Sequence, residues 1–389
     1  MMKSSTVHPQ KNIVRFAVVL TLALIIQLPV IAGAEELRVM TRNLYLGAEI
    51  QSLAAAGSYE EFLDGVEDAL MQIAANNFSE RAEALAAEIV EKKPHLVGLQ
   101  EVYDFKLNGG NYPCPPFCDY LGELLLQIEA QGASYRPVAT VKNFDITIPF
   151  FDGMIVSVLD RDVILVRDDV ETADIDVSGF CPDRVSDDGN GCNYQLVASA
   201  EIPPPDESSD PLTIDFTRSF VAIDAWIDGF PVRVVNTHLE VRYPDPDNPF
   251  SPFIQAAQAQ ELTIFLQLFP NEEGGPTILL GDINSSPEDE PIRTQLPFGT
   301  IVPPYMQLVN AGYIDAWPLR PGKPKGFTCC FGEDLSEKAD LYERIDIIFS
   351  SEKPNRVRAN VVGNSPSDRT DSGLWPSDHA GVAGRLRFP

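Results

Sequence analysis

Acidic, amide and histidine side chains recur in this sequence where apolar, strand-like runs end. The run 278–280 breaks at Gly281 and delivers Asp282 and Asn284 two positions apart. Because side chains at i and i+2 of a strand point to the same side, this pair can act together. The remaining members of the set lie in TRNLYLG, LVGLQEV, VVNTHLE, RIDIIF and SDHAGV; they are Asn43, Glu101, His238, Asp346, Asp378 and His379.

The oxygen-bearing members of this set suit metal-assisted hydrolysis of a phosphoester. The oxygens of Glu101, Asp378 and the Asn43 amide suit a hard divalent cation, and Mg²⁺ typically takes one or two carboxylates while keeping several waters. Such a cation neutralises phosphoryl oxygens and stabilises a leaving oxygen. Asp282 could orient or deprotonate an attacking water, and Asn284 could donate to a phosphoryl oxygen.

The histidines suit proton transfer. Histidine changes charge near neutral pH, so His238 and His379 fit acid/base or charge-stabilising work. A carboxylate such as Asp346 would fix the tautomer of His379 and favour its protonated form. Taken singly, each residue has a structural explanation, because Asp and Asn are common turn formers at strand ends. We assign His95 to such a structural role.

Strands and helices in alternation would position these residues. The spacing of Ala82, Leu85, Ala86, Ile89 and Val90 predicts a helix, and residues 255–269 predict a second one. A Cys-, Gly-, Pro- and Asp-rich loop is expected at about 178–210. Strands are predicted in LRVMTRN, HLVGLQEV, GMIVSVL, DVILVRDDV, FVAIDAWI, PVRVVNTHLEV, ILLGDIN, RIDIIFS and GVAGRLRF.

This order of elements favours an α/β fold with two packed sheets flanked by helices. No internal repeat and no long low-complexity linker divides the chain, so we expect one domain over residues 35–389. Residues 1–34 combine Lys3, Lys11 and Arg15 with an apolar run and a small-residue cleavage point, which is the pattern of a secretory signal peptide. The prediction is export to the medium or periplasm; an uncleaved anchor is the alternative.

The charge of the chain bears on its partners. With 29 basic and 57 acidic residues, the formal net charge is −28. An acidic surface repels phosphate backbones and anionic headgroups at long range. The six cysteines of an exported chain suggest disulfides. Cys114/Cys118 and Cys181/Cys192 could each close a small loop, zinc is the weaker alternative, and the adjacent Cys329 and Cys330 are left unassigned.

The motifs TRNLYLG, GLQEV, NTHLE, GDIN, RIDIIF and SDH, in this order, resemble the motif series of the endonuclease/exonuclease/phosphatase superfamily. That superfamily includes pancreatic-type deoxyribonucleases, abasic-site endonucleases, inositol polyphosphate 5-phosphatases and bacterial sphingomyelinases. The resemblance spans residues 38–383. It implies a four-layer α/β/β/α sandwich of two mainly antiparallel sheets, and cleavage of a phosphoester by an activated water that depends on Mg²⁺, with Mn²⁺ as an alternative.

The resemblance also implies roles for single residues. Glu101 resembles the main metal ligand, with Asn43 and Asp378 nearby. Asp282 and Asn284 match the water-activating and phosphate-contacting pair, and His379 with Asp346 matches the catalytic histidine and its carboxylate partner. His238 matches a histidine of the nuclease and sphingomyelinase branches, and Arg218 resembles a phosphate-contacting arginine. Arg42 before Asn43 and the acidic insertion at 201–217 depart from the common pattern.

The substrate stays open between a nucleic acid, a phospholipid and a small phosphoester. A nuclease needs a path lined by Lys and Arg, and the basic segments KPNRVR and RPGKPK are interpreted as solvated loops. A lipid phosphodiesterase would place exposed aromatics at a membrane surface in a transient contact. Phe144, Ile146, Ile148, Phe150 and Phe151 could form such a projecting hairpin, although a buried strand explains their pattern better. A catalytically silent binding module on the same fold is the non-enzymatic alternative.

Overall fold

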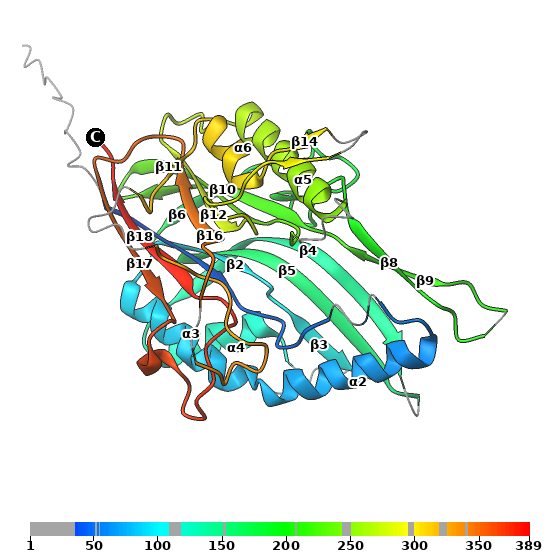
Figure 1. Ribbon diagram of the computed structural model, residues 1–389. Coiled ribbons are helices and arrows are strands. Elements are labelled where there is room, and N and C mark those ends of the chain that lie inside the picture. Colours follow the sequence, from blue (N-terminus) through cyan, green and yellow to red (C-terminus); the bar gives the residue numbers. More distant parts are fainter. Residues whose placement is uncertain are drawn as a thin grey trace, which may run out of the picture. The chain divides into compact units, whose positions relative to one another are not determined.

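The structure is a computed structural model (Figure 1) that describes residues 36–50, 53, 55–108, 118–150, 153–206, 208–242, 250–294, 299–318, 325–338 and 341–389. The chain from Ala34 to Pro389 forms one compact unit. Residues 1–34, for which a signal peptide is predicted, lie outside the described part. Within that part, no helix has both the length and the apolar character needed to cross a bilayer.

Two seven-stranded sheets form the centre of this unit, and most neighbouring strands in them are antiparallel. The first sheet has the order β17 (Arg356–Val362), β18 (Gly381–Arg387), β1 (Glu36–Asn43), β2 (Leu96–Gln100), β5 (Ile155–Arg167) and β3 (Asp104–Leu107), with β4 (Tyr135–Pro149) paired to β5. The second has the order β15 (Ile314–Asp315), β16 (Asp346–Ser350), β12 (Thr277–Asp282), β11 (Phe230–His238), β10 (Ser219–Ile227) and β6 (Glu171–Asp174), with β7 (Gly191–Asn193) paired to β10. Two further pairs are β8 (Ala198–Ile202) with β9 (Leu212–Phe216), and β13 (Ile292–Arg293) with β14 (Thr300–Ile301).

Helices cover the outer face of each sheet, which completes the four layers of the predicted α/β/β/α sandwich. Apolar side chains of α3 (Phe78–Lys92) and α4 (Tyr120–Ala130) pack on the first sheet, and those of α5 (Phe250–Leu268) and α6 (Pro304–Asn310) pack on the second. Helix α2 (Tyr59–Ala75) runs along the β4–β5 end (Figure 1). A short 3₁₀ turn, Pro366–Asp368, precedes β18. The fold class is therefore confirmed.

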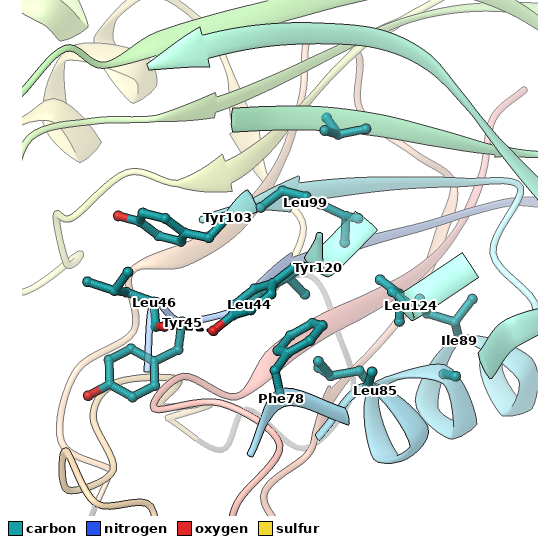
Figure 2. Close-up of a cluster of buried hydrophobic side chains, with 14 of the residues drawn as sticks. Leu44, Tyr45, Leu46, Phe78, Leu85, Ile89, Leu99, Tyr103, Tyr120 and Leu124 are labelled. Atoms are coloured by element: carbon teal, nitrogen blue, oxygen red, sulfur yellow. Dashed lines mark hydrogen bonds between the residues drawn. The ribbon is translucent and has the colours of Figure 1, made fainter. Parts of the chain in front are cut away.

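The core under α3 and α4 supports the chain just after β1. Figure 2 shows Leu44, Leu46, Phe78 and Tyr120 packed together, and the Tyr120 hydroxyl donates to the Leu46 carbonyl oxygen at 2.8 Å. The Phe78 and Tyr120 rings stack with centroids 3.5 Å apart. Burial of these large side chains contributes about 1.5–3 kcal/mol each relative to exposure. This packing fixes the backbone that follows Asn43.

A polar bridge crosses the apolar layer between the two sheets. Asn236 on β11 reaches β2, where its Oδ1 accepts from Gln100 Nε2 at 2.6 Å and its Nδ2 donates to the Leu99 carbonyl at 2.9 Å. Its partners are fully buried, as is Asn236 itself. A methyl group at Gly98 would collide with the Asn236 carboxamide, so glycine is what permits this close approach. The bridge fixes the position of one sheet against the other beside the strand ends.

Several details differ from the expectation. GMIVSVL and DVILVRDDV form one 13-residue strand, β5, because Asp160 and Arg161 continue its pairing with β4. The expected loop at 178–210 contains both β7 and β8. The acidic insertion folds largely as the β8–β9 hairpin, and KPNRVR leads into β17 rather than forming a solvated loop. Most of RPGKPK lies outside the described residues.

The apolar stretch after Asn143 is packed rather than projecting into solvent. Phe144, Ile146 and Ile148 lie on β4 and join a cluster with α2 and the β8–β9 hairpin. Phe150 belongs to the same cluster, whereas Phe151 lies outside the described residues. Cys181 bonds to Cys192 as expected, and Cys329 bonds to Cys330. The Cys114/Cys118 prediction involves Cys114, which also lies outside the described residues.

A buried ion pair ties β1 to α3. Arg42 Nε and Nη2 contact the two Glu88 carboxylate oxygens at 3.0 and 3.1 Å, and its Nη1 donates to the His379 carbonyl oxygen. Arg42 is fully buried and Glu88 is 7% exposed. Removing one partner of such a pair leaves an uncompensated charge in a medium of low dielectric constant.

We predict that Arg42→Met lowers the free energy of unfolding by about 3–5 kcal/mol, because Glu88 would stay buried without its cation. The double variant Arg42→Met/Glu88→Met should recover much of this loss. Urea denaturation followed by circular dichroism measures both. A single variant as stable as the wild type would contradict the role given to the pair.

Candidate active site

The strand order explains why the predicted residues meet. Strands β1 and β2 are parallel, so Asn43 at the end of β1 lies beside Gln100, which precedes Glu101. Strands β11 and β12 are also parallel, and β16 runs antiparallel to β12. The register consequently places His238, Asp282 and Asp346 side by side on three adjacent strands.

Asn43 and Glu101 form the part of the site that belongs to the first sheet. Asn43 Nδ2 donates to Glu101 Oε1 at 3.0 Å and to Asp282 Oδ2 at 3.2 Å, so it joins the two sheets. Its Oδ1 accepts from the Tyr45 backbone N–H at 2.9 Å. The other Glu101 oxygen accepts from the Leu46 backbone N–H at 2.8 Å. In this arrangement Asn43 orients both carboxylates.

Two of these polar residues hold the left-handed backbone conformation. Glu101 has φ 56° and Asn284 has φ 48°. Asparagine tolerates this region, but it is uncommon for a glutamate. Strained backbone of this kind is found preferentially at functional sites, where the surrounding structure holds it in place. Here the strain aims the half-buried Glu101 carboxylate toward Asn43.

His379 lies between carboxylates. Its Nδ1 is 2.9 Å from Asp346 Oδ2 and 3.7 Å from Asp282 Oδ2, and all three residues are buried. Burial lowers the pKa of His379, but the carboxylates of Asp346 and Asp282 outweigh burial and hold this pKa well above its usual value. For the acid Asp282, burial has the opposite effect and raises the pKa to about 7, although His379 opposes the rise.

The segment around Thr328 fixes the His379–Asp346 pair. Thr328 Oγ1 accepts from the Asp346 backbone N–H at 3.2 Å, and its carbonyl accepts from the Ala380 N–H at 2.7 Å. The Phe331 N–H donates to the Asp378 carbonyl at 2.7 Å. One short segment therefore contacts the backbone on both sides of the histidine and at its carboxylate partner.

His238 is set in a different environment. An Arg218 nitrogen lies 3.0 Å from His238 Nδ1, and His238 Nε2 lies 3.6 Å from Asp282 Oδ2. Burial, and then Arg218, holds the pKa of His238 well below its usual value. Because a guanidinium can only donate, one ring nitrogen must accept. With Arg218 donating to it, the accepting ring nitrogen carries no hydrogen, so His238 is a neutral imidazole beside Arg218 and Asp282.

Arg218 and Asn284 complete this side of the site. A second Arg218 nitrogen is 3.5 Å from Glu240 Oε1. The Asn284 backbone N–H donates to Asp282 Oδ1 at 2.9 Å, and its Nδ2 donates to the Leu239 carbonyl at 2.9 Å. Both Arg218 and Asn284 are half-buried, so they can reach a ligand that enters from solvent.

The carboxylate oxygens of Asp378 and Glu101 are suitable ligands for a hard cation, whose positive charge would stabilise both of them. Ser377 Oγ lies 3.3 Å from Asp378 Oδ1 and donates to it. Desolvation raises the pKa of Asp378 to about 6, and Glu101 adds to the rise whereas His379 opposes it. Two carboxylates that repel each other in this way are the donor set that Mg²⁺ or Mn²⁺ prefers. Among the described residues, two groups have ligand atoms within 4.8 Å of one another, and neither contains Asp378 or Glu101: they are Asp282, Asp346 and His379, and Cys329, Cys330 and His379.

Further residues near the site were not among the sequence predictions. Asp160 and Asp162 are buried on β5, where Asn143 Nδ2 donates to the first at 3.3 Å and Ser219 Oγ to the second at 2.8 Å. Burial raises the pKa of Asp160 to about 7, with Glu101 adding to the rise. The sequence feature that could have identified Asp160 and Asp162 is the presence of charged residues within an otherwise apolar strand. No sequence feature pointed to Tyr103, which lies near Glu101.

A two-sheet α/β sandwich with carboxylates, amides and a histidine–carboxylate pair gathered at its strand ends defines a class of phosphoester-cleaving proteins. Residues 69–379 match the model of the Endonuclease/Exonuclease/phosphatase family, and the chain belongs to this family. Its members are phosphoester hydrolases, among them nucleases and phosphatases, and they generally depend on a divalent metal. The sequence matches no curated protein.

Solved structures resemble this fold at low sequence identity. An endonuclease/exonuclease/phosphatase family protein from Leptotrichia buccalis is 16% identical, with a TM-score of 0.50 over 90% of this chain and 100% of that chain. A mannosyl-6-phosphatase from Bacteroides thetaiotaomicron is 15% identical, with a TM-score of 0.48 over 90% and 100% of the two chains. Truncated TDP2 from Caenorhabditis elegans is 15% identical, with a TM-score of 0.44 over 90% and 97%. The first of these supports the fold alone.

We predict that, in metal-free protein, His379 stays protonated at pH values where an ordinary histidine, with a pKa of about 6.5, is neutral. Asp346→Asn removes the nearest carboxylate and should lower the His379 pKa. Titration of the imidazole resonances by NMR measures this shift. Asp187→Asn, an exposed acid paired with Lys142, is the matched control. An unchanged His379 pKa in Asp346→Asn would refute the assigned coupling.

Proposed function

We propose that the protein is an exported, Mg²⁺-dependent phosphodiesterase, a phosphoric ester hydrolase in which Mn²⁺ can replace Mg²⁺. The observation that carries the proposal is the position of Asp282. Its Oδ2 lies 3.2 Å from Asn43 Nδ2, 3.6 Å from His238 Nε2 and 3.7 Å from His379 Nδ1. One carboxylate therefore links the donors of the first sheet to both histidines.

Each residue has a defined task in this mechanism. Glu101 and Asp378 would hold the cation, with Asn43 beside them, and the bound cation would neutralise charge on the phosphoryl oxygens. Asp282 accepts the proton of the attacking water, a task suited to a carboxylate whose pKa is about 7. Asn284 and Arg218 donate to phosphoryl oxygens, and neutral His238 keeps Arg218 and Asp282 in place.

Protonated His379 donates to an oxygen on the phosphorus, next to the water that Asp282 activates. Asp346 occupies its Nδ1, so Nε2 is the nitrogen left for an oxygen of the substrate. A hydrogen bond from a charged donor is roughly twice as strong as one between neutral groups. Because charge accumulates on the phosphoryl and leaving oxygens as the bond breaks, this donor stabilises the transition state more than the ground state.

An apolar cavity beside the site favours a phosphoester that carries a hydrocarbon group. The cavity has a volume of about 80 Å³ and is lined by apolar side chains of α2, the β4–β5 hairpin and the β8–β9 hairpin. Leu46, whose N–H donates to Glu101, and Tyr103 form its wall on the side of the site. Such a wall offers nothing to a polyanionic nucleic-acid backbone. A phosphoester with an apolar part next to its phosphoryl group is therefore preferred over a nucleic acid, and a phospholipid is the first candidate of this kind.

We predict that Asp282→Ala and His379→Ala each lower kcat for bis-p-nitrophenyl phosphate by about 10²–10⁴-fold, the usual contribution of an acid or base. The matched controls are His95→Gln, a histidine outside the site, and Asp206→Ala on the exposed turn between β8 and β9. Both should keep wild-type rates. Equal rates in the wild type and all variants would refute the assigned site, and no hydrolysis by the wild type would leave the silent binding module as the explanation.

The same assay tests the cation. EDTA should abolish hydrolysis, and added Mg²⁺ or Mn²⁺ should restore it to the wild type but not to Glu101→Gln at the same concentration. This difference follows because Glu101 is one of the two carboxylates assigned to the cation. Activity that survives exhaustive chelation would contradict metal dependence.

We predict that Ala69→Phe on α2, which fills the cavity, lowers kcat/KM for sphingomyelin in detergent micelles while leaving that for bis-p-nitrophenyl phosphate near the wild-type value. Overpacking costs about 1–3 kcal/mol, so thermal unfolding must confirm that the variant is folded. DNA, RNA and inositol phosphates complete the substrate panel. Equal losses on both test substrates, or faster hydrolysis of DNA than of any lipid, would exclude the preference for a hydrocarbon group.

Export rests on residues 1–34 alone, and removal of this segment would take away three positive charges and no negative ones. We expect the protein recovered from the medium or periplasm to begin at Glu35, as read by N-terminal sequencing. A recovered chain that still begins at its initial residues and sediments with membranes would point to the uncleaved anchor instead.

A further inference from the structure

The first sheet carries a grid of arginines on the face that bears α3. In the register of β1, β18 and β17, Arg38, Arg385 and Arg358 lie opposite one another in one row. The next row has Glu36 opposite Arg387, which in turn is opposite Arg356. Side chains directly opposite on neighbouring strands share a face. We call these six residues the arginine face.

The arginine face is short of negative charge. Glu36 lies within 3.2–3.7 Å of Arg38, Arg385 and Arg387, so one carboxylate serves three guanidinium groups. Among the described residues, no carboxylate comes within ion-pair distance of Arg356 or Arg358. Like charges directly opposite in a sheet destabilise it. The chain has a net charge of −28, so an excess of basic residues over the whole protein does not explain this cluster of arginines.

A cavity opens on this face. It has a volume of about 290 Å³, and its walls include Arg38, Arg358, Arg385 and Lys92, the last residue of α3. Glu91 lines it as well, but pairs with Lys92 at 2.6 Å. The Arg385 and Arg387 side chains are 42% and 45% exposed, so a ligand can reach them from solvent. A bound anion would supply the negative charge that the arginine face lacks.

We propose that the arginine face is a binding site for a compact, multivalent, phosphate-bearing anion. Guanidinium groups match phosphate geometry through paired N–H donors, and two strands here present them at neighbouring positions. A long nucleic acid fits poorly, because none of the six positions carries an aromatic side chain for base stacking. The acidic surface around a single basic patch also repels an extended polyanion.

This site is separate from the catalytic one. Arg38 and Asn43 both lie on β1, five residues apart, which corresponds to about 17 Å along an extended strand. The phosphate-bearing anion can be soluble or can be the head group of a membrane lipid. Both sources present the same chemistry to the arginines, and a binding experiment with one arm for each separates them.

The soluble arm titrates sodium tripolyphosphate into the full chain by isothermal calorimetry, in EDTA so that no cation occupies the catalytic site. We expect wild type and Asn284→Ala to bind equally, because Asn284 belongs to the catalytic site. Arg358→Glu should bind at least about tenfold more weakly, equivalent to 1.4 kcal/mol. Arg293→Glu, an equal charge change at another exposed strand position, should bind like the wild type.

The lipid arm measures cosedimentation with vesicles of phosphatidylcholine, with or without phosphatidylglycerol. Binding only to the anionic vesicles, lost in Arg358→Glu and kept in Arg293→Glu, assigns a lipid head group as the source. Binding of tripolyphosphate without vesicle binding assigns a soluble anion. Binding of neither probe, or equal losses in Arg358→Glu and Arg293→Glu, would overturn the proposal.

Thermal unfolding separates binding from a structural role. Without anion, Arg358→Gln should unfold at or above the wild-type temperature, because the substitution removes a like-charge contact with Arg385. Tripolyphosphate should raise the wild-type unfolding temperature and leave that of Arg358→Gln nearly unchanged. A lowered unfolding temperature in the absence of anion, with the rise on adding tripolyphosphate intact, would show that Arg358 stabilises the fold and does not bind the anion.

Discussion

The candidate active site depends on the polar bridge between Asn236 and Gln100. The site draws Asn43 and Glu101 from one sheet, and Asp282 and its neighbours from the other, so its geometry is only as fixed as the contact between the sheets. An apolar interface resists separation but is weakly directional. The buried carboxamides must satisfy each other, and a slipped register would leave them unpaired at a cost of about 1–3 kcal/mol each. The bridge thereby makes one alignment of the sheets preferable to its neighbours.

Burial then sets the charge states in the site. Asp282 and His379 face each other in a medium where interactions between charges are strong. Burial alone would favour the neutral form of both groups. Two carboxylates around the imidazole outweigh burial and raise the pKa of His379, whereas burial lowers the pKa of His238 and Arg218 adds to this effect. The pKa values of two chemically identical side chains are therefore displaced in opposite directions by their surroundings.

The sequence was sufficient for the fold class and for the set of residues at the strand ends. Apolar runs that end in Asn43, His238 or Asp282 are visible in the chain, because both strand length and side-chain type are local properties. The Asn43 amide donates to both Glu101 and Asp282. This contact depends on two sheets meeting, and no pattern in the local sequence predicts it. For the same reason, the lowered pKa of His238 could not be predicted, since it follows from burial and from Arg218, which immediately precedes β10.

Other features failed for physical reasons of their own. Arg356 and Arg358 had the composition of a solvated loop, and only strand pairing with Arg385 and Arg387 reveals a patterned face. The β5 strand was divided at Asp160 because charge within a strand usually marks its end. Helix α2 was missed, although its buried Phe62, Val66, Ala69 and Ile73 recur at helical spacing. Its buried Phe62 and Val66 pack against the two hairpins, which the linear sequence does not bring together.

The hydrogen bonds of Thr328 determine how the His379–Asp346 pair responds to motion. Thr328 accepts hydrogen bonds from the Asp346 N–H and from the N–H of Ala380, the residue after His379. We therefore expect a displacement of this segment to move the backbones of the histidine and its carboxylate partner together. Because folding already orders this pair, the entropic cost of ordering it does not weaken substrate binding.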